Sequence, residues 1–333
     1  MATPYRIFGA ELSPYSVKTR SYYRYKGIPH EWIPRSADTM AEYGKYARLP
    51  IIPAVATPED EGLQDSTPIL EAMESTFPEP STHPPSPTLK FLSELLEEFG
   101  DEWGNKWMFH YRWADEADQR SAAERLVAGM MRNAPESDRA AMADQLRERM
   151  VSRIGVVGSN EHTAPIIEAS FRNGIDLLEK HLAGRPYLFG GRPCFADFGL
   201  WGQIYNAWTD PTCGKLLADK PAIRAWIERM LDPKDEGDFE DWNELAPTLE
   251  PFLREEVRLF LTWSAANADA IGSGAEELTV DLDGKKWTQS VGGPQKYHAK
   301  SLKEIRRKYA EVARDPELRG ILERAGCLPF LAS

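Results

Sequence analysis

The chain has 333 residues, of which 42% are hydrophobic and 28% are charged, a composition typical of globular proteins and not of disordered or fibrous ones. Its formal net charge of −12 argues against a nucleic-acid partner, because such partners are bound by clustered lysines and arginines. No apolar stretch approaches the roughly 18 residues of a membrane span, and the three scattered cysteines suit a reducing compartment, so we expect a cytoplasmic protein that does not bind membranes.

The first part of the chain is predicted to alternate between strands and helices. Residues 5–10 have the alternating apolar side chains of a short strand, and residues 17–26 have the amphipathic spacing of a helix that ends at Gly27. Between them, Ser13 is expected to be the helix N-cap and Pro14 the first helical residue. The elements that follow are a strand, a polar stretch, two short strands and a helix, at residues 30–35, 38–48, 49–56, 62–64 and 66–75.

The remainder of the chain is predicted to be mainly helical. A proline-rich run at residues 78–87 cannot continue a helix and is typical of a stiff linker. Helical spacing follows at residues 89–131, 137–157 and 165–182. The last hundred residues add a helix, a hairpin with Asp-Gly at its tip and a closing amphipathic helix, at about residues 246–271, 278–289 and 300–312.

Three motifs in the first part of the chain follow one another in order. Ser13 stands at the start of the first predicted helix, Ile52-Pro53 precedes the third predicted strand, and Asp65-Ser66 opens a helix about a dozen residues later. This arrangement resembles the thioredoxin-like amino-terminal domain of cytosolic glutathione S-transferases. In that family the proline of the second motif is cis, and the spacing to Asp65 assigns this role to Pro53 rather than to the proline three residues earlier.

Further markers of the same family lie in the second half of the chain. The loop at residues 187–197 resembles the one that leads into a buried, N-capped helix in the transferases, with Asp197 at its usual place. Cys194 replaces the usual serine or threonine, and a thiol accepts hydrogen bonds less well than a hydroxyl. Residues 220–230 look like the closing helix of the family. The resemblance therefore covers about residues 1–231.

The resemblance implies a fold of the α/β plus all-α class. A thioredoxin-like, glutathione-binding domain is expected at residues 1–78, a proline-rich linker at 79–88 and an all-helical bundle domain at 89–231. Residues 232–333 then form an extension of helix, β-hairpin and helix, which is expected to pack on the helical domain because its first helix is too apolar to remain in water. The resemblance also implies a homodimer.

The resemblance assigns roles to individual residues of this chain. Ser13 is expected to donate a hydrogen bond to the glutathione sulfur and to hold it as thiolate. The backbone of Ile52, beside Pro53, is expected to bind the cysteinyl part of glutathione. Asp65 and Ser66 are expected to hold its γ-glutamyl end.

Other candidates follow from position alone. Lys45 and Arg48 are candidates for binding the glycyl carboxylate of glutathione, and Asp101 is a candidate for its amine. The resemblance implies that the electrophile lies against aromatic side chains at the start of the first helix and in the helical stretch at residues 89–131, for which a place in the core is the alternative. These side chains are Tyr15, Trp103, Trp107 and Tyr111.

Two other hydroxyl groups compete with that of Ser13. Ser16 lies one turn into the predicted helix, and Tyr5 lies early in the first strand. Because positions 13 and 16 are both serine, thiol–disulfide chemistry that needs a cysteine nucleophile is excluded. The sequence predicts a glutathione transferase of the EC 2.5.1 type that uses glutathione and no metal to attack small hydrophobic or aromatic electrophiles, as in detoxification. The alternatives are a glutathione-dependent etherase, dehalogenase or isomerase, and a non-catalytic binding or assembly module.

Overall fold

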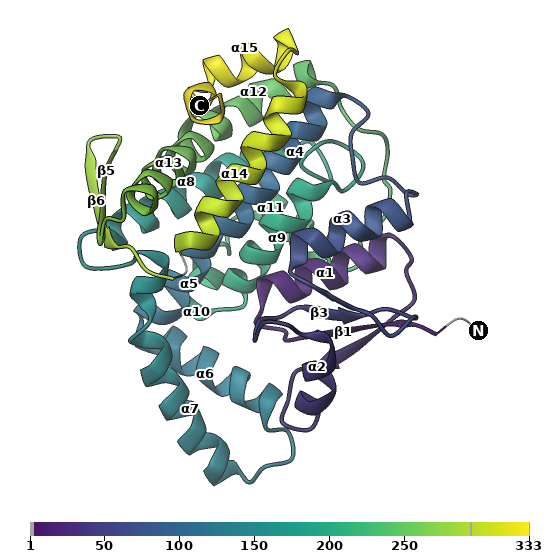
Figure 1. Cartoon of the computed structure of the whole chain (residues 1–333), viewed down its shortest axis with the longest axis vertical. Coiled ribbons are helices and arrows are strands. Elements are labelled where there is room, and N and C mark those ends of the chain that lie inside the picture. Colours follow the sequence, from purple (N-terminus) through teal and green to yellow (C-terminus); the bar gives the residue numbers. More distant parts are fainter. Residues whose placement is uncertain (1–2, 294, 333) are drawn as a thin grey trace.

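The computed structural model describes residues 3–293 and 295–332, so the extreme ends of the first and last predicted domains, residues 1–2 and 333, lie outside the described residues. A small mixed sheet with helices is followed by a mostly helical region (Figure 1). The first part comprises β1, α1, β2, α2, β3, β4 and α3, at Tyr5–Gly9, Pro14–Tyr25, His30–Pro34, Met40–Tyr46, Ala54–Ala56, Gly62–Gln64 and Ser66–Thr76.

The four strands lie in the order β2-β1-β3-β4, with β1 parallel to β2 and antiparallel to β3. Neighbouring side chains of a strand point to opposite faces of a sheet. Ile7 accordingly joins the main core, together with apolar side chains of α1 and α3. Phe8 packs on the other face against Tyr43 and Tyr46 of α2. This arrangement is the thioredoxin-like fold that the sequence predicts.

The helical region begins with one long, continuous helix. Its first part, α4 (Pro87–Phe99), continues through a π-helical turn, η1 (Gly100–Gly104), into α5 (Asn105–Ala114). Asp115 then caps a new helix, which divides the helical stretch predicted at residues 89–131. The helices that follow are α6, α7, α8, α9, α10 and α11, at Glu116–Met130, Glu136–Val151, Ala164–Leu182, Phe195–Trp208, Pro211–Leu216 and Pro221–Arg229. None of the helices in the described part of the chain is long and apolar enough to cross a membrane.

The buried helix α9 lies at the centre of this region and packs against α1, α4, η1 and α5. A capping box starts it, in which the Cys194 amide donates to Asp197 Oδ2 at 3.0 Å. Asp197 Oδ1 accepts bonds from the Leu188 amide and the Trp226 indole, each at 2.9 Å. Burial raises the pKa of Asp197 to about 6. Cys194 in place of a serine or threonine leaves the cap intact, because Asp197 makes most of the hydrogen bonds at the start of α9.

The residues beyond α11 form a further set of elements that pack on the helical region (Figure 1). Trp263 and Trp287 lie against Trp103 of η1, with ring centroids 6.2 and 5.7 Å apart. Tyr309 packs on Phe91 of α4. The elements are α12, η3, α13, β5, β6, α14, α15 and α16, at Trp242–Phe252, Leu253–Val257, Arg258–Ser273, Glu277–Leu282, Lys285–Ser290, Gln295–Val312, Pro316–Arg324 and Leu328–Leu331.

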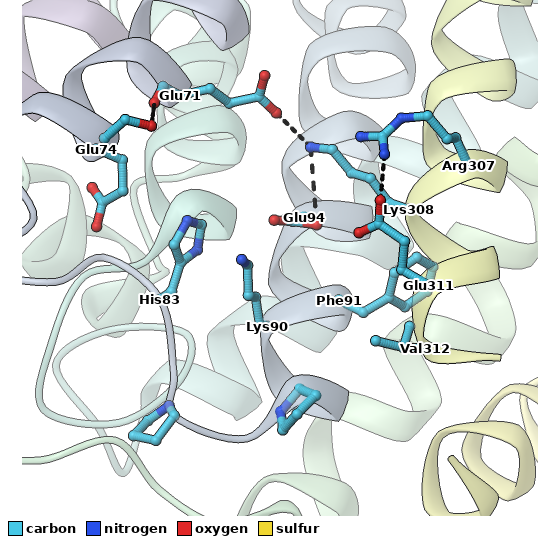
Figure 2. A pocket seen from close by; sticks show the side chains of 13 residues that line it. Glu71, Glu74, His83, Lys90, Phe91, Glu94, Arg307, Lys308, Glu311 and Val312 are labelled. Atoms are coloured by element: carbon cyan, nitrogen blue, oxygen red, sulfur yellow. Dashed lines mark hydrogen bonds and ion pairs between the residues drawn. The ribbon is translucent and has the colours of Figure 1, made fainter. Parts of the chain in front are cut away.

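A cleft of about 610 Å³ lies where α14 meets α3, the linker and α4 (Figure 2). Lys308 of α14 reaches both neighbouring helices, with Nζ 2.6 Å from a Glu71 carboxylate oxygen and 3.9 Å from one of Glu94. His83 and Lys90 also line the cleft. The extension therefore contacts the thioredoxin-like part as well as the helical region.

Candidate functional site

Ser13 is the N-cap of α1, as the sequence predicts, and its hydroxyl oxygen accepts two hydrogen bonds. The Ser16 amide donates to it at 3.3 Å and the Ser16 hydroxyl at 2.9 Å. Ser13 is half-buried, whereas Ser16 has no exposed surface. Because the Ser13 oxygen accepts the Ser16 proton, the Ser13 proton is free to be donated outward, at the positive end of the helix. The geometry favours Ser13 over Ser16 as the group that meets a ligand.

The peptide bond between Ile52 and Pro53 is cis, which confirms the assignment of this role to Pro53. It lies directly before β3, where Pro53 is buried and Ile52 half-buried. The Gln64 side chain braces the preceding loop, because its Nε2 donates to the carbonyl oxygens of Leu49 and Ile51 at 2.6 and 2.9 Å. The loop thus presents the Ile52 backbone from a fixed position.

Asp65 and Ser66 form the start of α3. Asp65 has a φ of 77°, a left-handed conformation that is rare for a residue with a side chain and is held only where the surroundings enforce it. Its carboxylate makes no capping bond to the helix, and burial raises its pKa. Ser66 is buried beside it. Asp65 and Ser66 form a corner between β4 and α3, separated in the sequence from the cis peptide by β3 and β4. The backbone strain at Asp65 makes this corner a candidate binding site.

A buried lysine lies beneath this corner. The Nζ atom of Lys18 donates to Asp101 Oδ2 at 2.6 Å and to the hydroxyls of Thr67 and Ser66 at 3.1 and 3.4 Å, and it forms a close ion pair with Glu97. Burial alone lowers the pKa of Lys18, but the Asp101 and Glu97 carboxylates raise it above its usual value. The ammonium is therefore fixed in the charged form. Sequence reasoning did not find it, since α1 gives no local signal for partners on α4 and η1.

Carboxylates outnumber cations around Lys18. Burial raises the pKa of Asp101 to about 7, although Lys18 opposes this, and burial also raises the pKa of Glu98. Asp101 Oδ1 and Glu98 Oε1 are buried and have no hydrogen-bond partner among residues 3–293 and 295–332. The Tyr15 hydroxyl donates to the Asp101 carbonyl oxygen at 2.8 Å and ties α1 to η1. The arrangement is suited to a ligand that brings a positive charge to this corner.

The three aromatic side chains expected to line an electrophile pocket on α5 and η1 lie instead in the core. Trp103 and Trp107 are 0% and 1% exposed, and the indole N–H of each donates to the Ser170 hydroxyl at 2.9 Å. Tyr111 is buried against Phe171. Trp103 is covered by α13 and β6 of the extension, and helical spacing alone cannot distinguish a core face from a pocket wall. The expectation of a pocket at these three positions is therefore corrected.

A different apolar group lies next to Ser13. Leu12 packs at the edge of a cluster formed by α5, α6 and α7, whose partly buried members include Phe109, Met130 and Met150. The Ala37 amide lies 3.5 Å from the Met130 carbonyl oxygen, so the end of α6 also reaches the loop that follows β2. The paired helices α6 and α7 project past the edge of the sheet (Figure 1). Nothing in the sequence pattern of these helices indicates a place beside Ser13.

The candidate cations for a carboxylate, Lys45 and Arg48, lie at the end of α2 and in the loop after it. Both are exposed, and neither side chain makes a hydrogen bond or ion pair within the described residues. The ring of Tyr5, which carries the alternative hydroxyl, packs against Tyr23 and Phe77 at the far end of β1 from Ser13. Within residues 3–293 and 295–332, no group of three or more His, Cys, Asp or Glu side chains is placed to hold a metal ion.

The fold and these motifs define a class of protein in which a thioredoxin-like domain, with a serine at the start of its first helix, is joined to a helical domain. Residues 12–76 match the family model of the glutathione S-transferase N-terminal domain, and residues 139–229 match that of the C-terminal domain. The chain therefore belongs to the glutathione S-transferase family, a family of transferase enzymes. The extension after α11 lies outside both matches, and the domain boundaries given above remain predictions.

Individual relatives are distant. The isoprene-epoxide–glutathione S-transferase of Rhodococcus sp. (strain AD45) is 23% identical over 233 residues, which are 68% of this chain and 94% of the relative. A glutathione S-transferase of Methylobacterium radiotolerans, solved with glutathione sulfonate, has a TM-score of 0.41 and 19% identity over 74% of this chain and 94% of its own. A glutathione S-transferase of Methylobacillus flagellatus, solved with glutathione bound, has a TM-score of 0.41 and 16% identity over 68% of this chain and 94% of its own.

Proposed function

We propose that the protein joins glutathione to a small hydrophobic or aromatic electrophile, with the Ser13 hydroxyl holding the glutathione sulfur as thiolate. The observation that carries this proposal is the direction of the hydrogen bond between the Ser16 and Ser13 hydroxyls at the start of α1. Ser13 accepts the proton of Ser16 and keeps its own for a ligand. A half-buried donor at a helix N-terminus is suited to an anionic sulfur.

The energies involved are of the right size. A free thiol has a pKa of about 8.5, and lowering it to about 6.5 requires about 2.7 kcal/mol of preferential thiolate stabilisation. A hydrogen bond to a charged group contributes about 1.5–3 kcal/mol. The helix N-terminus adds about 0.3–1 kcal/mol. One hydroxyl donor and one helix end together contribute about 1.8–4 kcal/mol, a range that includes the stabilisation required.

The rest of glutathione is proposed to lie along the edge formed by the cis peptide and the start of α3. The Ile52 backbone would pair with the cysteinyl unit, and Ser66 with Asp65 would hold the γ-glutamyl carboxylate and amine. The unpartnered oxygen of Asp101, whose other carboxylate oxygen lies 3.5 Å from the Ser66 hydroxyl, supports a positive group here, and the glutathione amine supplies one. Lys45 or Arg48 would bind the glycyl carboxylate at the other end.

The electrophile is proposed to lie beside Leu12, on the apolar side chains of α6 and α7. An epoxide is the first acceptor class to test, because the Rhodococcus relative is named for one. In that reaction the thiolate attacks an epoxide carbon, a C–S bond forms as the C–O bond breaks, and the resulting alkoxide takes up a proton. Ether cleavage, dehalogenation and isomerisation use the same thiolate and remain the alternative reactions.

Calorimetric titration with glutathione, followed by an acceptor screen, tests the proposal. We expect glutathione to bind and at least one of a small epoxide, an alkyl halide and an aryl chloride to be converted to its thioether. Ser13→Ala should retain binding and lose most of the turnover. Absence of glutathione binding would contradict the proposal and favour a non-catalytic assembly module. Binding without conversion of any of the three acceptors would contradict the electrophile class.

A further inference from the structure

Arg112 of α5 is nearly fully buried, at 3% exposure, and donates to four acceptors, one in the loop after β1 and three at residues 206–210. Its Nε lies 2.7 Å from Asp210 Oδ2, before α10. Its Nη2 lies 2.9 and 3.1 Å from the carbonyl oxygen and Oδ1 of Asn206, at the end of α9. Its Nη1 lies 2.9 Å from the carbonyl oxygen of Leu12. The last contact joins the helical region to the loop that carries Ser13.

The Leu12 carbonyl belongs to the same peptide plane as the Ser13 amide. That amide donates to the Ala10 carbonyl oxygen at 3.1 Å, so residues 10–13 form a tight turn between β1 and α1. Fixing the Leu12 oxygen therefore fixes the plane from which the Ser13 side chain departs. Within the described residues, Arg112 is the side chain that bonds to this carbonyl.

We propose that Arg112 is a positioning residue for Ser13, an inference that rests on the function proposed above. The strength of a hydroxyl-to-thiolate hydrogen bond depends on its distance and angle, so the turn must be held as firmly as the helix behind it. A guanidinium suits this role because its planar fork reaches the Leu12, Asn206 and Asp210 acceptors at the same time. A lysine ammonium at the same place is a point donor and cannot span all three.

Asp210 balances the charge of Arg112. Its side chain is 0% exposed, and it also forms a close ion pair with Arg125 of α6. Arg125 makes no bond to residues 10–13, and its side chain is 32% exposed. Replacing Arg125 therefore removes one partner of Asp210 without touching the turn, which makes it the matched control for Arg112.

The test measures the pKa of the bound glutathione thiol, by thiolate absorbance against pH, in the full-length protein. We expect Arg112→Met to raise this pKa by at least half of the shift that Ser13→Ala causes. Ser13→Ala combined with Arg112→Met should give no further rise, because Arg112 acts through Ser13. Arg125→Met should lower stability and leave the pKa at the parental value.

Removal of Arg112 alone leaves Asp210 buried with one partner fewer, so the single variant can fail to fold. In that case the double variant Arg112→Met, Asp210→Asn, which removes both charges, is compared with Asp210→Asn alone. We expect the thiol pKa to be higher in the double variant by at least half of the shift that Ser13→Ala causes. A purely structural arginine would change stability and not the thiol pKa. That result overturns the inference. So does a thiol pKa in the combined Ser13→Ala, Arg112→Met variant that rises by the sum of the two single-variant rises. If Ser13→Ala itself leaves the pKa unmoved, the proposed function and this inference both fall.

Discussion

Replacing Lys106 with methionine should stabilise the protein, although this lysine is surrounded by aromatic rings. Lys106 of α5 is 1% exposed, and its Nζ lies 3.6 Å from the ring centroid of Trp263 and 5.8 Å from those of Trp103 and Trp287. Its hydrogen bond, at 3.2 Å, goes to the Val157 carbonyl oxygen. Within the described residues, no carboxylate pairs with it.

The magnitude follows from two opposing effects. Burial lowers the pKa of Lys106 from 10.5 to about 7. At about 1.36 kcal/mol per pKa unit, this corresponds to about 5 kcal/mol of destabilisation when the lysine is protonated. The Trp263 ring offsets about 2 kcal/mol of it by attracting the ammonium. We therefore expect Lys106→Met to raise the free energy of unfolding by about 1–3 kcal/mol at pH 6.5.

The effect has a defined pH dependence. Between pH 7 and pH 10.5 the unfolded chain holds a proton on Lys106 that the folded chain has released, so the stability of the parent rises with pH across this window. The methionine variant lacks this rise. The difference in stability between variant and parent should be largest at or below pH 7 and should shrink as the pH approaches 10.5.

Urea unfolding of both proteins at several pH values measures the difference. Lys300→Met is the control, since Lys300 is exposed and lies 5.4 Å from the ring centroid of Tyr297, an exposed aromatic residue. It should change stability by less than about 0.5 kcal/mol. A Lys106→Met variant that is less stable than the parent at every pH would contradict this prediction, because attraction by the three tryptophan rings would then outweigh the cost of burying the charge.

Three further predictions concern the extension, the assembly and the site. Truncation after Leu231 should give insoluble or destabilised protein, because it uncovers Trp103; a truncated protein that melts at the parental temperature would show an independent appendage. Light scattering at micromolar concentration should give the mass of a homodimer, and a persistent monomer mass would contradict this. Lys18→Met should weaken glutathione binding measured by calorimetry, because Ser66 loses its buried ammonium neighbour and Asp101 its counter-charge. Unchanged affinity would show that the buried ion pairs of Lys18 do not contribute to glutathione binding.

The parts of the site that the sequence predicts are those set by local backbone chemistry. Ser13 caps α1 because capping depends on residues that are adjacent in the chain, whereas the cis bond before Pro53 is expected from the family resemblance and the spacing to Asp65. The hairpin at the Asp-Gly pair forms for the same reason as the cap, with positive φ angles at Asp283 and Gly284 that match a tight two-residue turn. Such features leave a signal within a few residues.

The parts that the sequence does not predict depend on contacts between distant segments. Lys18 meets Glu97 and Asp101 across 79 and 83 residues, and Arg112 meets Leu12 across 100. Trp103 has the same helical spacing in a core as on a pocket wall, and only the docking of the extension decides between them. Spacing along one helix carries no information about what covers it.

Thiolate absorbance of bound glutathione as a function of pH tests whether the Ser13 hydroxyl holds the sulfur as thiolate. We expect a thiol pKa well below about 8.5 in the parent and a rise of about one to two units in Ser13→Ala. We also expect nearly unchanged glutathione affinity in that variant, since Ile52, Asp65 and Ser66 hold the rest of the molecule. A shift in Ser16→Ala and not in Ser13→Ala, or no shift in either while Ser13→Ala loses only the roughly 1 kcal/mol of a helix cap, would contradict this role of Ser13.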